Sequence, residues 1–147
     1  IPNIGMATVM DIGEKDNIHP ADKKAGSDRL AFLALANTYG KSGFACSGPV
    51  LKEMTVSGSM VKLTFNNAIN GLTSYGKGLS CFEVAGSNKR FVPASAFITG
   101  TGITLFSPSV AEPVAVRYAF KDFIIGDLFN TEGLPASSFR TDEWPVE

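Results

Sequence analysis

One histidine and one aspartate are the side chains in this sequence whose types and spacing could do chemistry. His19 is the only histidine, and Asp16 lies three residues before it in a polar stretch. A carboxylate that accepts a hydrogen bond from imidazole Nδ1–H fixes the tautomer, so that Nε2 can take a proton from a nucleophilic hydroxyl and return it to a leaving group. The same pair also fits a surface or helix-capping histidine, and spacing alone leaves both interpretations open.

The loop that carries this pair is expected to join a strand to a helix. Residues 4–12 are almost continuously apolar, which is typical of a strand covered on both faces in a parallel sheet, and Gly13 ends the run. Sites in open α/β sheets lie beyond the carboxyl ends of the strands. A loop that leaves such a strand is therefore a place where His19 could meet a substrate.

The helix after this loop is expected over residues 20–39. Proline costs little at the first helical position, so Pro20 could begin the helix. Leu30 and Leu33 belong to an apolar stripe with helical spacing, and Gly40 would end the helix.

Beyond Gly43 the apolar residues alternate with a period of two. Three hairpins are predicted, over residues 54–65, 81–92 and 96–106, and residues 114–120 form a further alternating strand. Several short strands separated by turn signals at such intervals indicate an antiparallel β-sandwich.

The tail from residue 126 has no period, yet it is apolar enough to be packed against the rest of the chain. It contains the only tryptophan, Trp144, for which we expect a packing role. Arg117 is expected to form a structural ion pair, with contact to a sugar carboxylate as the alternative. Arg140 and Asp142 are expected to hold the tail in place.

Composition excludes several classes of function. Of the 147 residues, 44% are hydrophobic and 18% charged, which is typical of a folded globular protein. The formal net charge is −1 and no basic stripe is present, so we expect no nucleic-acid partner. The longest apolar run, residues 30–36, is far shorter than the roughly 20 residues that cross a bilayer, so no membrane partner is expected.

The two cysteines, Cys46 and Cys81, have neither the spacing of a zinc knuckle nor that of a redox pair. We therefore expect no metal and no cofactor. The sequence leaves open whether these cysteines form a disulfide or remain two small thiols.

The residues around the candidate pair carry a resemblance to a known family. Asp11-Ile12-Gly13, the D-x-x-H-P element from Asp16 to Pro20, and Arg29-Leu30 resemble the last catalytic block of the sialate O-acetylesterases, a branch of the SGNH-type esterases. Further matches in the second half of the chain are residues 47–50, 82–86, 113–119 and 133–144. The resemblance spans nearly the whole chain.

This resemblance implies an enzyme that removes O-acetyl groups from a sugar, typically the 9-O-acetyl group of sialic acid, through a Ser-His-Asp triad and an acyl-serine. His19 matches the base of the family and Asp16 its orienting acid. The implied fold class is α+β. Residues 1–45 would be the C-terminal piece of an SGNH-like α/β hydrolase domain, with one strand and one helix, and residues 46–147 an antiparallel β-sandwich.

The sequence departs from the family because the nucleophile block and the oxyanion-hole blocks are missing. Gly86-Ser87-Asn88 is superficially similar to a nucleophile block, but it falls in a predicted hairpin turn. Ser57, Ser59 and the serines at 137–138 are interpreted as loop residues. A base without its nucleophile and oxyanion donors forfeits most of the acceleration, so this chain alone should be nearly inert. We therefore expect it to be the C-terminal part of a longer esterase.

A lone strand and helix cannot cover each other's buried faces. We therefore expect residues 1–45 to be covered by an upstream, nucleophile-bearing part of the same esterase, by the β-sandwich of this chain, or by a homodimer partner. The substrate would be an O-acetylated sugar, and the family implies a periplasmic or secreted protein. Two alternatives stay open: a non-catalytic β-sandwich that serves as an accessory or carbohydrate-binding module, and a fragment of an acetylxylan-type esterase.

Overall fold

Alternating apolar residues build the two main sheets of the protein. In the computed structural model, which describes residues 4–146, every paired strand is antiparallel to its neighbour. One sheet has the order β1-β2-β7-β6, formed by β1 (Val50–Ser57), β2 (Met60–Asn66), β7 (Gly102–Phe106) and β6 (Ser95–Thr99). The other has the order β10-β8-β4-β5, formed by β10 (Phe139–Arg140), β8 (Ala115–Tyr118), β4 (Phe82–Ala85) and β5 (Val92–Pro93). A short pair, β3 (Leu72–Thr73) and β9 (Phe129–Asn130), completes the set.

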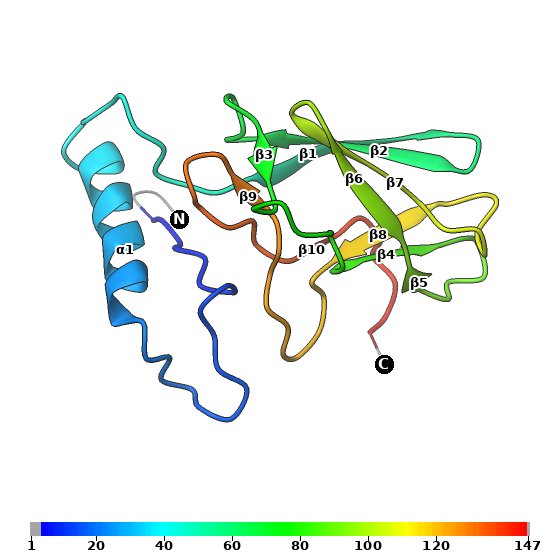
Figure 1. Cartoon of the computed structure of the whole chain (residues 1–147), viewed down its shortest axis with the longest axis horizontal. Coiled ribbons are helices and arrows are strands. Elements are labelled where there is room, and N and C mark those ends of the chain that lie inside the picture. The colour runs from blue at the N-terminus through cyan, green and yellow to red at the C-terminus, as the bar shows by residue number, and fades with distance from the viewer. Residues whose placement is uncertain (1–3, 147) are drawn as a thin grey trace.

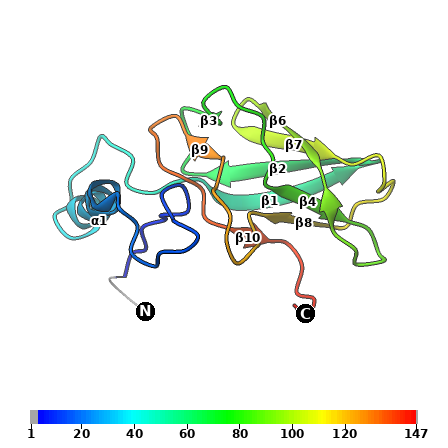
Figure 2. The same cartoon turned by 60° about the horizontal axis from the view of Figure 1, so that its bottom comes forward.

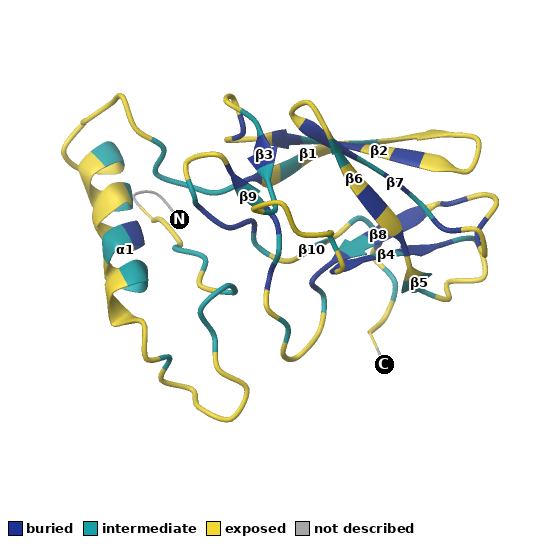
Figure 3. Cartoon of the chain, viewed as in Figure 1, coloured by how far each residue is buried: buried dark blue, intermediate teal, exposed yellow. Residues whose placement is uncertain are grey.

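The two four-stranded sheets lie face to face, as Figures 1 and 2 show, and the core lies between them. Val61, Leu63 and Ile103 from the first sheet and Phe82 and Val116 from the second are fully buried. The dark blue residues of Figure 3 mark this layer. The α+β class and the β-sandwich are thus confirmed, and all three predicted hairpins are present as β1–β2, β4–β5 and β6–β7.

Hydrogen bonds of a buried asparagine hold the irregular tail in place. Asn130 is completely buried, and its Nδ2 donates to the carbonyl oxygens of Ser47 and Asn67 at 3.2 and 3.1 Å. Its Oδ1 accepts from the Leu134 N–H at 2.8 Å. One amide therefore connects the segment before β1, the segment after β2 and the tail, because a buried polar group must find such partners.

The single helix among the described residues, α1 (Lys23–Asn37), is shorter than the range expected from the sequence. Its N-cap is Asp22, whose Oδ1 accepts from the Ala25 N–H at 3.0 Å, so Pro20 lies before the helix instead of beginning it. At the other end Thr38 is the C-cap, and Gly40 adopts a positive φ of 62° just beyond it.

The strand expected over residues 4–12 is wrong: this segment is irregular. A buried parallel strand needs hydrogen-bonded neighbours, and no strand of the described chain pairs with it. Its carbonyl groups bond individually instead, that of Thr8 to a side chain of α1 and that of Met10 to the Gly126 N–H at 3.2 Å. In Figures 1 and 2 this segment and α1 stand together at one side of the sandwich.

Candidate active site

Asp16 and His19 lie in the loop that precedes α1, as the sequence predicts, and both are exposed. Within residues 4–146 no hydrogen bond or ion pair joins their side chains. Catalytic hydrogen bonds are often long or misaligned without substrate and tighten in the Michaelis complex, so this geometry does not remove either residue from consideration. Their catalytic roles remain a prediction.

The base of the loop is fixed by a partly buried ion pair. The guanidinium of Arg29 on α1 donates from Nη1 and Nη2 to the two carboxylate oxygens of Asp11, at 2.7 and 2.6 Å. Nη1 also donates to the Thr8 carbonyl at 2.8 Å. Arg29 is the one buried residue of α1. Because two parallel hydrogen bonds join the guanidinium to the carboxylate, this bidentate pair fixes both the distance and the angle between the two side chains, which a single point charge would not do.

The sides of the loop are held by Glu14. Its Oε1 accepts from the Ala21 N–H at 2.6 Å, and its Oε2 from Asn17 Nδ2 at 3.4 Å. Asn17 Oδ1 in turn accepts from the His19 N–H at 2.9 Å. A chain of polar contacts therefore closes the loop and ends on the backbone of the candidate base.

The sequence analysis includes Asp11 and Arg29 in the block that resembles the esterase family, but it predicts no contact between them and gives Glu14 no role. The available signal was an arginine beside the apolar Leu30 on the helix, together with an aspartate at the end of an apolar run. Such a charge on an inward-facing position needs a buried partner.

The candidate serines lie on the sandwich and not on the loop. Ser87 is in the turn between β4 and β5, and Ser59 is in the turn between β1 and β2, as predicted. The loop position predicted for Ser57 is wrong, because Ser57 is the last residue of β1, where the pairing of β1 with β2 continues up to the turn. Ser137 and Ser138 precede β10. In the part of the chain that the structure describes, His19 has no hydrogen bond to any of these serines.

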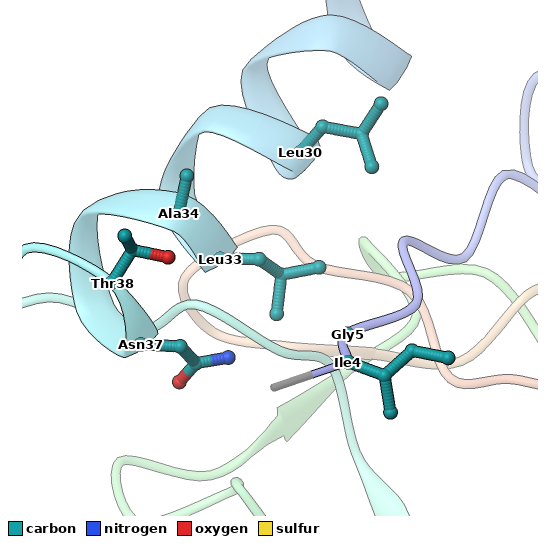
Figure 4. Close-up of a pocket in the computed structure, with 7 residues that line it drawn as sticks. All are labelled: Ile4, Gly5, Leu30, Leu33, Ala34, Asn37 and Thr38. Atoms are coloured by element: carbon teal, nitrogen blue, oxygen red, sulfur yellow. The ribbon is translucent and has the colours of Figure 1, made fainter. Parts of the chain in front are cut away.

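The hollow shown in Figure 4 is separate from the candidate pair. It has a volume of about 550 Å³ and lies between α1 and the irregular segment before it. Its lining consists of Ile4, Gly5, Leu30, Leu33, Ala34, Asn37 and Thr38. Because neither His19 nor Asp16 borders it, this hollow is not a substrate pocket for that pair.

Arg117 forms the structural ion pair that the sequence predicts. It donates from Nε and Nη2 to the two oxygens of Asp142 at 2.9 and 2.8 Å, and it lies 4.0 Å from the ring centroid of Phe91. Arg140 donates to the Trp144 carbonyl at 2.9 Å, and the Trp144 ring packs 5.7 Å from Phe91. The packing roles expected for the tail residues are confirmed.

Both cysteines are free thiols. Burial raises the pKa of Cys81 to about 11, and the neighbouring carboxylate of Asp127 adds to this shift, so Cys81 is a poor nucleophile at neutral pH. Among residues 4–146 no group of three or more His, Cys, Asp or Glu side chains is placed to hold a metal ion. No helix in the same range is long and apolar enough to span a membrane.

A known structure shares this arrangement of helix, loop and sandwich. The crystal structure of a carbohydrate acetylesterase from Xanthomonas citri superposes with a TM-score of 0.88 and 37% sequence identity over 94% of this chain. The chain spans about one third of that enzyme's length, 32%. No family model matches the chain, and neither does any curated protein. The loop and the sandwich are therefore similar to one part of a carbohydrate acetylesterase.

Proposed function

We propose that this chain is part of a carbohydrate O-acetylesterase of the SGNH type, in which His19 is the general base and Asp16 orients it. The observation that carries this proposal is the likeness of 94% of the chain, at 37% identity, to part of a carbohydrate acetylesterase. The D-x-x-H-P element from Asp16 to Pro20 supports the same assignment.

In the proposed mechanism the chain supplies the proton-transfer half of a Ser-His-Asp triad. His19 Nε2 takes the proton of a serine hydroxyl as the serine oxygen attacks the acetyl carbonyl, and then gives that proton to the sugar oxygen, which leaves as a hydroxyl when its bond to the acetyl carbon breaks. Water hydrolyses the acetyl-serine in the same way. The serine and the oxyanion donors belong to another segment, so the isolated chain is nearly inactive.

We assign the substrate class as O-acetylated sugars, with the 9-O-acetyl group of sialic acid as the first candidate. Acetylated xylan is the rival substrate, because related acetylesterases share the same histidine block. The remaining alternative is a β-sandwich with only an accessory or carbohydrate-binding role. Such a protein is proposed to be periplasmic or secreted, and we propose no nucleic-acid or membrane partner.

The test measures acetate release by the esterase that contains this chain and by the chain alone. We expect His19→Ala to lower kcat by about 10²- to 10⁴-fold, because general acid–base catalysis contributes that much. Asp16→Asn should lower kcat as well. Lys15→Ala, an exposed change in the same loop, is the matched control and should leave kcat unchanged.

Three outcomes would contradict parts of the proposal. Full activity in His19→Ala would leave the chain an accessory role only. Appreciable turnover by the chain alone would show that its own serines suffice. Faster release from acetylated xylan than from 9-O-acetyl sialic acid would select the rival substrate.

The proposal includes what covers α1. Leu30, Tyr39 and Phe44 remain exposed on and beside the helix, with relative exposures of 58%, 69% and 41%. Apolar side chains grouped in this way mark an interaction surface. Since two thirds of the Xanthomonas citri enzyme has no counterpart in this chain, we propose that the nucleophile-bearing part of the esterase packs there.

A further inference from the structure

We infer that Arg29 and Glu14 are positioning residues, which hold the loop 13–21 in the shape that presents His19. This inference rests on the proposed function, because it gives the loop a catalytic purpose. It adds two residues that do not touch substrate and act only through the backbone of the loop.

The loop needs such contacts because it has no apolar anchor of its own. Residues 14–19 are all exposed, and the one large apolar side chain among them, Ile18, is 89% exposed. Segments with few buried apolar contacts open at low free energy. Polar contacts therefore have to define the conformation of this loop.

Arg29 defines where the loop leaves the irregular segment. Its side chain is only 10% exposed and reaches from α1 to the Asp11 carboxylate and the Thr8 carbonyl, so one guanidinium fixes the chain at two points just before the loop. On the other side of the same segment the Met10 carbonyl accepts from the Gly126 N–H, 3.2 Å away on the sandwich. The entry to the loop is thus held between the helix and the sandwich.

Glu14 defines how the loop closes. Its carboxylate accepts a hydrogen bond from the Ala21 N–H at 2.6 Å. Ala21 is seven residues further along the chain and directly precedes Asp22, the N-cap of α1. Asn17 extends the connection, because its Nδ2 donates to Glu14 and its Oδ1 accepts from the His19 N–H. Loss of the Glu14 carboxylate removes the cross-loop contact while α1 keeps its own cap.

The first test uses the chain itself and amide ¹⁵N relaxation of residues 15–19. We expect order parameters near 0.85, the value of a rigid backbone, to fall below about 0.6 in Glu14→Ala. Glu14→Gln keeps an oxygen that can accept from Ala21, so it should retain most of the order. Arg29→Lys keeps the positive charge but cannot form the bidentate pair with Asp11. It should lower the order parameters of residues 11–19 while the β2 amides keep their chemical shifts.

Lys24→Ala is the matched control for this test. It removes an exposed ion pair with Asp28 on the same helix and should leave residues 15–19 unchanged. Unchanged order parameters in both Glu14→Ala and Arg29→Lys would overturn the inference.

The second test measures kcat and KM in the esterase that contains the chain. We expect Glu14→Ala and Arg29→Lys to lower kcat by up to about a hundredfold with little change in KM, because misplacing a catalytic group by about 1 Å can cost that much. Glu14→Gln should restore most of kcat. If His19→Ala abolishes activity but these variants keep full kcat, the positioning roles are wrong and the proposed function stands. If His19→Ala itself keeps full activity, the proposed function fails.

Discussion

At the scale of single residues, one hydroxyl organises the turn into the tail. Tyr118 is completely buried, with its ring 4.8 Å from Phe82, and burial raises the pKa of its hydroxyl. Its Oη accepts from the backbone N–H groups of Asp127 and Leu128 at 2.9 and 2.8 Å. Both donors would lose their partner without this oxygen, since neither Asp127 nor Leu128 lies in a strand.

Tyr118→Phe is therefore expected to destabilise the protein although it changes a single atom. A buried donor without a partner costs roughly 1–3 kcal/mol, so we expect the free energy of unfolding to fall by about 2–4 kcal/mol in urea denaturation. Tyr39→Phe removes the same atom from a residue that is 69% exposed, so it should change the free energy of unfolding by less than about 0.5 kcal/mol. Equal effects of the two variants would show that the Tyr118 hydroxyl has no such role.

At the scale of elements, the last strand is held by charge as well as by pairing. β10 pairs with the edge of β8 over only two residue pairs. Just beyond it, the Asp142 side chain is 1% exposed and accepts hydrogen bonds from Nε and Nη2 of Arg117. The Arg117 guanidinium lowers the pKa of Asp142 below its usual range.

This shift predicts a pH dependence of the tail. The folded state binds fewer protons at Asp142 than the unfolded state, so the stabilisation is complete above the unfolded pKa of about 3.9 and is lost as pH falls through the lower, folded pKa. We expect fluorescence of Trp144, the sole tryptophan, to report tail release in acid below about pH 4. Asp142→Asn should abolish that transition and lower stability at neutral pH by about 3 kcal/mol, since it leaves Arg117 without its charge partner.

The control for the pH dependence is Asp122→Asn. Asp122 is exposed and has no ion pair among the described residues, so its removal should leave the acid transition in place. An unchanged transition in Asp142→Asn would assign the pH dependence to another carboxyl group.

The hairpins of the sandwich could be predicted because their two-residue period and their turns are local features. Val61, Leu63 and Phe65 alternate inward on β2, and Gly58, with a φ of 58°, permits the turn before it. The irregular structure of residues 4–12 could not be predicted, because the apolar run of this segment is also typical of a buried strand. An apolar run becomes a buried strand only where neighbouring strands pair with it. The presence of those neighbours cannot be read from the run itself.

The candidate site was predictable only in part for a similar reason. His19 and Asp16 are recognisable from a spacing within four residues. The contact between Arg29 and Asp11 joins residues 18 apart in the sequence, and its geometry depends on how α1 packs against an irregular segment. Pattern and propensity do not fix such a contact.

At the scale of the whole molecule, α1 and the sandwich are stabilised very differently. The sandwich encloses a core of fully buried side chains, whereas α1 buries only Arg29 and presents mostly exposed residues in Figure 3. Met10 links the two parts, because it packs against the core and its Sδ lies 3.1 Å from the Ser138 amide nitrogen. We therefore expect α1 to open locally while the sandwich stays folded.

Hydrogen exchange of the chain, alone and with the nucleophile-bearing part of the esterase, tests both this difference and the docking proposed for α1. In the chain alone, amides of α1 should exchange through openings that denaturant hardly promotes, and those of β2 and β7 through global unfolding. Adding the nucleophile-bearing part should slow exchange in α1 at least tenfold, or about 1.4 kcal/mol, because the exposed Leu30 and Tyr39 become buried. The control Leu30→Glu should prevent this protection and leave β2 unaffected. Protection of α1 that instead rises with the concentration of the chain alone would identify a second copy as the partner, and exchange unchanged under both conditions would mean that nothing packs on this helix.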